Sequence, residues 1–210
     1  MSTKNTVITL EGSSKIIAEY LRYAINSIIF QRGIYPAKEF EKYNRYGVLL
    51  YISKNEGVKR FLDAILPNIQ AWCGQKLVIS IMLVVYNSLT KEVAERWEFN
   101  IKYEKDGIQY ESATADSGAQ QMIPHKPSEQ IYAEICSVMR QITSTIALLP
   151  LLDFHCTFDV LVNKRGGIPS KWSKTGSIDL SNTQTIHTRQ FATGFHMMKT
   201  SVTYSLQQDK

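Results

Sequence analysis

A helical stripe of apolar residues is the clearest pattern along the chain, and it spans Ser128–Leu149. Apolar residues alternate three and four positions apart there, the spacing of one buried face of an α-helix. They are Ile131, Ile135, Val138, Ile142, Ile146 and Leu149. At about 100° per residue, Arg140 points directly away from this stripe. The residues that flank it on the outer side are Gln141, Ser144 and Leu148. Such a group indicates a binding face, although a merely solvated surface would have the same spacing.

Two further helices are predicted earlier in the chain. The first has a broad apolar face, begins near Ser13 as its N-cap and closes at Gly33. The second opens with a capping box formed by Ser53 and Glu56. Pro67 falls inside its apolar pattern and is expected to kink this helix or end it early. The breadth of the first helix's apolar face places that helix near the centre of the domain.

Strand-like patterns occupy much of the remaining chain. Lys76–Tyr86 is typical of a strand buried on both faces, and Glu95–Tyr103 alternates apolar and polar residues. These two segments are expected to form a hairpin. Other strand-like segments are Val48–Ile52, Cys156–Val162, Ile186–Phe195 and Thr200–Leu206. Helices and strands in this order predict an α+β fold, with three central helices packed on a mainly antiparallel sheet.

Two segments lack a regular pattern. Glu104–Pro127 is polar and is predicted to be a mobile loop rather than a domain boundary. From Asn163 onward the chain is polar and rich in turn residues until strand-like patterns return. Trp172 stands out there, because a tryptophan in a polar segment needs a surface to pack against. It either holds the segment down or forms part of a ligand pocket.

Composition limits the classes of protein that the chain fits. Its 210 residues suit one large domain or two small ones, and 44% hydrophobic residues suffice for a full core. The N-terminus has no signal-peptide pattern, and the longest apolar run is too short to span a bilayer. Three widely spaced cysteines fit a reducing compartment. We expect no membrane association from these features.

Patterns typical of catalysis or cofactor binding are weak in this sequence. The four histidines show no metal-ligand spacing, and there is no phosphate-binding glycine loop. His155 and Cys156 are adjacent, but neighbouring residues of a strand point to opposite faces. We therefore expect no metal and no cofactor. The net charge of +5 permits nucleic-acid binding, but basic residues form no long block, so no direct binding is expected.

Five short blocks carry a resemblance to a known family. In order along the chain they are Thr9–Ser13, Ala24–Pro36, Glu95–Phe99, Arg140–Thr145 with Leu149–Leu152, and Ile168–Trp172. Together they resemble the spindle-checkpoint proteins of the HORMA-domain family, over about residues 7–206. The resemblance implies a single HORMA domain at 7–206, with a core at 7–162 and a C-terminal "safety belt" at 163–206. It also implies a signalling switch without enzymatic activity.

The resemblance further implies how such a protein binds a partner. Family members have an open and a closed fold, and in the closed fold a partner peptide adds as a strand beside the segment matching Cys156–Val162. The belt then closes over the peptide. The candidate strand residues are Phe158, Val160 and Val162. The candidate belt residues are Trp172, Phe191, Val202 and Tyr204.

The expected partners also follow from the resemblance. They are a kinetochore coiled-coil receptor, the activator of the anaphase-promoting complex, a kinase-like subunit of the mitotic checkpoint complex, and an AAA+ remodelling ATPase with its adaptor. Open and closed copies are expected to pair through Arg140, Gln141, Ser144 and Leu148. Because the family commonly has Phe where this chain has Leu148, we expect that pairing to be weaker in this protein. The expected locations are the nucleus, the kinetochore and the cytoplasm.

Three other functions remain as alternatives at this point. One is the sister HORMA protein that serves as a regulatory subunit of a translesion DNA polymerase. Another is a cysteine-dependent hydrolase that uses Cys156. A third is direct nucleic-acid binding by the basic surface, which would show a steep dependence on salt.

Overall fold

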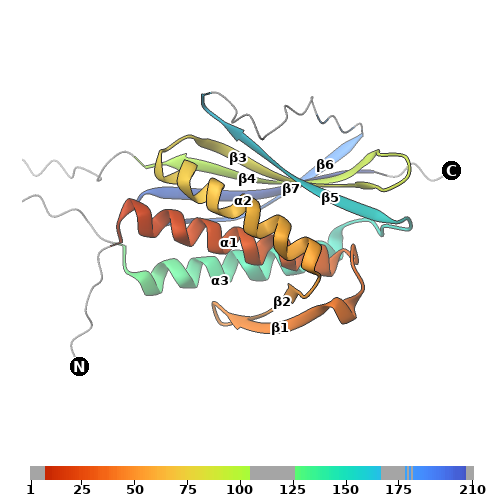
Figure 1. The fold of residues 1–210 in the computed structure, drawn as a ribbon, viewed down its shortest axis with the longest axis horizontal. Coiled ribbons are helices and arrows are strands. Elements are labelled where there is room, and N and C mark those ends of the chain that lie inside the picture. Colours follow the sequence, from red (N-terminus) through yellow and green to blue (C-terminus); the bar gives the residue numbers. More distant parts are fainter. Residues whose placement is uncertain (1–7, 105–125, 167–177, 179, 181, 207–210) are drawn as a thin grey trace, which may run out of the picture.

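Three layers make up the computed structural model, which describes residues 8–104, 126–166, 178, 180 and 182–206. A five-stranded sheet forms one layer, three helices form the middle layer, and a two-stranded sheet lies on the far side of the helices (Figure 1). This arrangement confirms the predicted α+β fold with helices packed on an antiparallel sheet.

The three helices form close to where the apolar patterns predict them. They are α1 (Leu10–Gln31), α2 (Glu56–Gly74) and α3 (Ser128–Thr145), and α3 continues into the 3-10 turn η2 (Ile146–Leu148). All six residues of the predicted α3 stripe are buried. Pro67 lies inside α2, yet the helix is assigned without a break, so the expected early end is wrong.

Both predicted N-caps are corrected by the structure. Thr9 caps α1, because its side chain accepts the Gly12 N–H at 3.0 Å, and Ser13 instead lies buried inside the helix. Asn55 caps α2 by accepting two backbone N–H groups. Ser53 ends a strand and is buried. The capping residue lies four residues before the predicted one in α1 and two residues after it in α2.

The large sheet has the order β5-β3-β4-β7-β6, and every neighbouring pair is antiparallel. Its strands are β3 (Val78–Asn87), β4 (Val93–Tyr103), β5 (Cys156–Lys164), β6 (Thr183–Ala192) and β7 (His196–Ser205). The predicted hairpin of the two central strands is confirmed as β3–β4. The two C-terminal strands form a second hairpin, β6–β7, which joins the sheet along β4.

The small sheet pairs β1 (Phe40–Arg45) with β2 (Val48–Ser53). A short 3-10 turn, η1 (Ala37–Glu39), leads into it. The sequence indicates β2 but gives no signal for β1, whose residues are mostly polar and exposed. The predicted loop Glu104–Pro127 falls mainly on residues 105–125, which lie outside the described residues.

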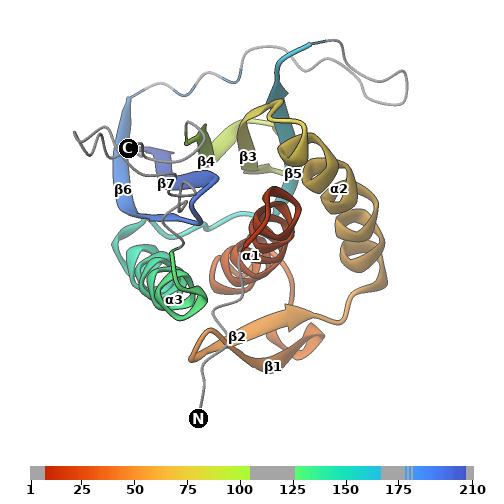
Figure 2. The same cartoon turned by 90° about the vertical axis from the view of Figure 1, so that its left-hand side faces the viewer.

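The core lies between the large sheet and the helices. Its largest fully buried side chains include Trp97 and Phe99 of β4 and Tyr20 of α1. Figure 2 looks along the helices and shows α1 in the centre, α3 beneath β6 and β7, and α2 on the side of β5. Each edge of the large sheet therefore has a different helix beside it.

Candidate functional site

The large sheet ends at two edge strands, β5 and β6, and their surroundings differ. An edge strand presents unpaired N–H and C=O groups, which form a template for another extended chain. Within the described part of the chain, β5 pairs with β3 alone and no strand lies along its other side. The outer side of β5 is therefore the structure's candidate for binding a peptide strand.

Main-chain groups of β5 alternate between β3 and this free side. At one end of β5 the Arg165 N–H donates to Leu77 O, and at the other end His155 O accepts the Ser88 N–H. Because main-chain groups alternate along a strand, the odd-numbered residues between them turn their N–H and C=O groups toward β3. The even-numbered residues consequently turn their N–H and C=O groups outward. One of these groups, the Val160 N–H, donates to Oδ1 of Asp159 at 2.7 Å. A carboxylate thus occupies one main-chain donor of the free edge.

Aromatic side chains line the helix side of β5. The Phe158 ring lies 6.3 Å from the Tyr35 ring and 5.8 Å from the Phe61 ring of α2, measured between centroids. Lys164, at the end of the strand, places Nζ 5.2 Å from the centre of the Trp72 ring. Val160 is buried, whereas Phe158 and Val162 are partly buried against the core. The predicted strand residues thus share one apolar, largely aromatic face.

The opposite edge, β6, is covered by α3. Oε1 of Gln141 accepts the Arg189 N–H at 2.5 Å, and Oε2 of Glu134 accepts the Ala192 N–H at 3.2 Å. These helix side chains take the place of a neighbouring strand. Among the residues that the structure describes, the outer main-chain groups of β6 therefore have helix side chains as partners, whereas no helix or strand covers the outer side of β5 in the same way.

The predicted belt residues lie mainly on the β6–β7 hairpin, away from β5. Phe191 is buried with its ring 4.8 Å from that of Tyr20, and Val202 and Tyr204 are buried in β7. The hairpin pairs with β4, so β3 and β4 separate it from β5. Trp172 lies outside the described residues. The role of all four side chains in holding a peptide stays a prediction.

Three of the four residues predicted for self-pairing are exposed on α3 and η2. Arg140 and Ser144 are exposed on α3, and the Leu148 side chain is 69% exposed. Gln141 differs, because it is half-buried and bonded to β6 within the same molecule. The outer face of α3 exists as predicted, but the sequence gives no sign that Gln141 is already engaged.

A buried polar cluster fastens the turn of the β6–β7 hairpin to the helices. The Ser13 hydroxyl lies 2.5 Å from both Thr193 Oγ1 and His196 Nδ1, and His196 Nε2 lies 3.2 Å from the carbonyl of Cys73. Burial lowers the pKa of His196. The sequence could not indicate this cluster, because its members come from α1, α2 and the hairpin and share no spacing pattern.

A buried ion pair links α1 to the start of β4. Nη2 of Arg32 contacts Oε1 of Glu95, and their side chains are only 5% and 2% exposed. Arg32 also donates to Pro150 O at 2.6 Å, and the indole N–H of Trp97 donates to Oε2 of Glu95 at 3.2 Å. Burial raises the pKa of Glu95, while Arg32 opposes that shift. The sequence could have indicated that Glu95 is buried. On the alternating strand β4, Glu95 lies two residues before Trp97 and so shares its buried face.

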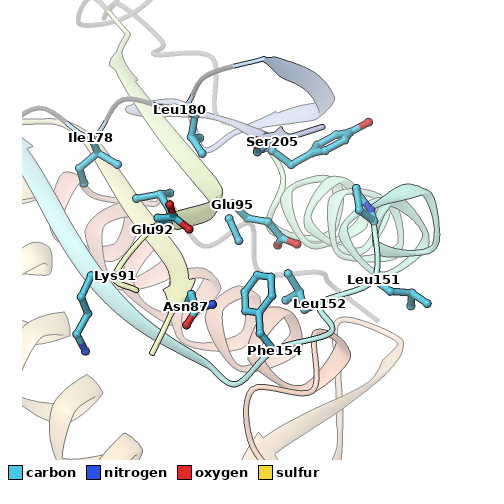
Figure 3. A pocket seen from close by; sticks show the side chains of 14 residues that line it. Asn87, Lys91, Glu92, Glu95, Leu151, Leu152, Phe154, Ile178, Leu180 and Ser205 are labelled. Carbon is cyan, nitrogen blue, oxygen red and sulfur yellow. The ribbon is translucent and has the colours of Figure 1, made fainter. Parts of the chain in front are cut away.

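Glu95 also lines an open cavity of about 590 Å³ at the end of the sheet (Figure 3). Its wall includes Glu92, Leu151, Phe154 and Leu180. No histidine or cysteine is among its described lining residues, and the carboxylate of Glu95 is committed to Arg32. The described lining of the cavity therefore contains neither a cysteine nucleophile nor a histidine base.

The described residues hold neither a metal-binding cluster nor a membrane-spanning helix. No three His, Cys, Asp or Glu side chains gather in a way that would hold a metal ion. None of the helices there is both long and apolar enough to cross a membrane. Burial raises the pKa of the Cys156 thiol, the reverse of what an activated nucleophile needs, so the geometry does not favour the hydrolase alternative.

The structure packs helices on an antiparallel sheet whose edge strand β5 has a free outer side in the described residues, and the family model for the HORMA domain matches residues 13–196. The chain belongs to the HORMA-domain family.

Relatives within that family are similar over nearly the whole chain. The mitotic spindle assembly checkpoint protein MAD2A of Dictyostelium discoideum is 34% identical over 207 residues, which cover 97% of this chain and 96% of that protein. The human protein of the same name is 34% identical over 201 residues, covering 95% and 93%. The resemblance to spindle-checkpoint HORMA proteins is thus confirmed.

Solved structures agree with this assignment. A chain in the crystal structure of the mitotic checkpoint complex has a TM-score of 0.79 and 31% identity, covering 93% of this chain and 99% of that one. C. elegans HTP-2 bound to the HIM-3 closure motif has a TM-score of 0.72 at 16% identity, with 99% of each chain covered, and so shares the fold. Subunit 2 of Drosophila melanogaster DNA polymerase zeta matches at 25% identity, over only 47% of this chain and 49% of that protein.

Proposed function

We propose that this protein is a spindle-checkpoint adaptor that captures an extended peptide as an added strand on β5. The observation that supports this most strongly is the contrast between the two sheet edges. Side chains of α3 occupy the β6 edge, whereas the outer side of β5 has no strand along it in the described residues. Full-length similarity to spindle-checkpoint proteins supplies the biological setting.

The chemistry of capture follows from the geometry of β5. A partner strand would bond to the outward N–H and C=O groups of the even-numbered residues, which gives affinity largely independent of sequence. Its alternate side chains would meet the aromatic wall formed by Phe158, Phe61 and Tyr35, which gives specificity for apolar residues. The Asp159 carboxylate must leave the Val160 N–H for the ladder to form.

The belt and the partners complete the proposal. The segment 163–206 would close over the bound peptide, so that the peptide leaves slowly. The peptides would come from a kinetochore coiled-coil receptor and from the activator of the anaphase-promoting complex. A kinase-like subunit would join the resulting complex, and an AAA+ ATPase with its adaptor would reopen the belt. Pairing of two copies would use the exposed Arg140, Ser144 and Leu148. The protein would act in the nucleus, at kinetochores and in the cytoplasm, as a binding module rather than an enzyme.

Two variants of one residue test the strand-addition mechanism. Val162→Ala removes part of a side chain but keeps the outward N–H, whereas Val162→Pro also removes that N–H and places a ring in the path of a new strand. Because this N–H points away from β3, both variants should melt at similar temperatures. Overlapping peptides spanning the receptor and the activator should bind the Val162→Ala protein, and they should bind the Val162→Pro protein at least about a hundredfold more weakly. Equal binding by the two would contradict strand addition on β5.

The checkpoint assignment needs a separate experiment in cells. Partners captured with the intact protein from mitotically arrested cells should include the receptor and the activator, and their recovery should fall with the Val162→Pro variant. Capture of a polymerase catalytic subunit instead would favour the translesion alternative, which has weak support from the partial match to DNA polymerase zeta subunit 2.

A further inference from the structure

The side chains on the helix side of β5 change character along the strand. From Phe158 to Val162 they are apolar, whereas Lys164, two residues further on, carries a positive charge. The Lys164 side chain is half-buried, and its Nζ lies 5.2 Å from the centre of the Trp72 ring of α2. None of the ion pairs among the described residues includes Lys164. One end of this side of β5 is therefore aromatic, and the other end is basic.

Two aromatic side chains of α2 show that this helix runs alongside β5. Phe61 and Trp72 are eleven residues apart, close to three helical turns, so they share one side of α2 and lie about 17 Å apart. Phe61 lies against Phe158 of β5. Trp72 lies against Lys164, which is six residues further along the strand and about 20 Å away when the strand is extended. Figure 2 likewise shows α2 on the side of β5. A strand added to β5 would therefore meet an aromatic contact at one end and an ammonium group at the other.

The acidic residues of α2 and β5 do not neutralise this basic end. Glu56 and Asp63, the two acidic residues of α2, each form an ion pair with another basic residue. Asp159 of β5 accepts a main-chain N–H. Arg165, which directly follows Lys164, is exposed and adds a second positive charge at this end of the strand. The surroundings of Lys164 are therefore complementary to a negatively charged side chain.

We propose that Lys164 selects an acidic residue in the captured peptide, six residues away from the apolar residue that meets Phe158. This inference rests on the proposed function, because it specifies which peptides the free edge of β5 takes. Directly opposite side chains of paired strands lie about 5 Å apart at Cβ, where opposite charges stabilise the pair and like charges destabilise it. A spacing of six keeps both peptide side chains on one face. In an antiparallel peptide the acidic residue comes before the apolar one, and in a parallel peptide it comes after.

Peptide binding to the full-length protein tests this selectivity. The probe is the receptor or activator peptide that binds the wild-type protein most tightly, and its anchor is the apolar residue whose replacement by alanine weakens binding most. Glutamate, glutamine or lysine is placed in turn at the positions six residues before and six residues after this anchor. At one of the two positions, the glutamate peptide should bind about fivefold or more tightly than the lysine peptide, with the glutamine peptide between them. This difference should shrink at high salt, which screens partly exposed charges.

Three variants identify the residue that makes the selection. Lys164→Glu should reverse the order in which the peptides bind. Lys164→Met keeps an apolar stem against Trp72 without the charge and should remove most of the discrimination. Lys42→Glu is the matched control, because it makes the same change of charge at an exposed position of β1, which lies across the helices from the large sheet (Figure 1). It should keep the wild-type order.

Two kinds of failure can be told apart. If the glutamate and lysine peptides bind the wild-type protein equally at both positions, or if Lys164→Glu keeps the wild-type order, the selectivity assigned to Lys164 is wrong, while peptide capture on β5 stands. If no receptor or activator peptide binds even the wild-type protein, the proposed function itself fails, and the selectivity fails with it.

Discussion

Replacing Arg32 by methionine should destabilise the protein by an amount that depends on pH. The substitution leaves the Glu95 carboxylate buried with the Trp97 indole N–H as its remaining close donor. Breaking a buried ion pair on one side typically costs about 3–5 kcal/mol, because a charge stays buried without a partner. Glu95 can avoid that cost by binding a proton, and the free energy of doing so depends on pH.

The expected size of the effect follows from the ordinary pKa of glutamate, 4.5. Protonating such a group at pH 7 costs about 3.4 kcal/mol, and at pH 5 it costs about 0.8 kcal/mol. The folded variant binds a proton that the unfolded chain releases, so its stability falls as pH rises above 4.5. The destabilisation relative to wild type should therefore shrink from about 3 kcal/mol at pH 7 to below about 1 kcal/mol at pH 5.

Urea unfolding of wild type and Arg32→Met at pH 5, 6 and 7 measures this difference. The double variant Arg32→Met with Glu95→Gln is the control, because its buried amide does not titrate. Its destabilisation relative to wild type should therefore not rise steeply between pH 5 and pH 7. An Arg32→Met protein that is equally destabilised at pH 5 and pH 7 would show that Glu95 does not depend on Arg32 for its charge.

Three further changes have defined outcomes. Trp97→Ala should cost about 3–5 kcal/mol in unfolding free energy, because the side chain is fully buried in β4; a normal melting temperature would contradict this packing. Arg140→Glu should leave the melting temperature unchanged but abolish dimers in sedimentation, and persistent dimers would show that α3 is not the pairing face. Burial holds the pKa of His196 below 6.5, so stability should fall as pH drops below 6.5. Replacing His196 by Asn should remove part of that slope, and an unchanged slope in this variant would contradict the role of the buried imidazole.

Local patterns in the sequence were enough to predict the helices and the central hairpin. The six stripe residues of α3 and the alternation of β4 around Trp97 each report burial within one element. The strand β1 was missed because its residues are mostly polar and exposed. The cap of α1 was misplaced because Ser13 has the chemistry of a cap but bonds to His196, 183 residues further along the chain.

The candidate site depends on contacts between elements, which one sequence does not reveal. The order of strands in the sheet decides that β5 is an edge and that Phe191 and Val202 lie on the far side of β4. Helical periodicity placed Gln141 beside Arg140 on the outer flank of α3, but only the fold shows that Gln141 is half-buried and bonded to Arg189 of β6. The family resemblance points to the strand that contains Phe158. Only the structure shows that the Phe158 ring contacts Tyr35 and Phe61.

The most direct test of peptide capture is amide exchange along β5 with and without a bound partner peptide. Strand addition predicts an alternating result, because even-numbered residues turn their N–H groups outward. The amides of Phe158, Val160 and Val162 should become protected on binding. Those of Thr157 and Leu161 already face β3 and should change little. A bound peptide that leaves the three even-numbered amides unprotected would contradict capture on β5.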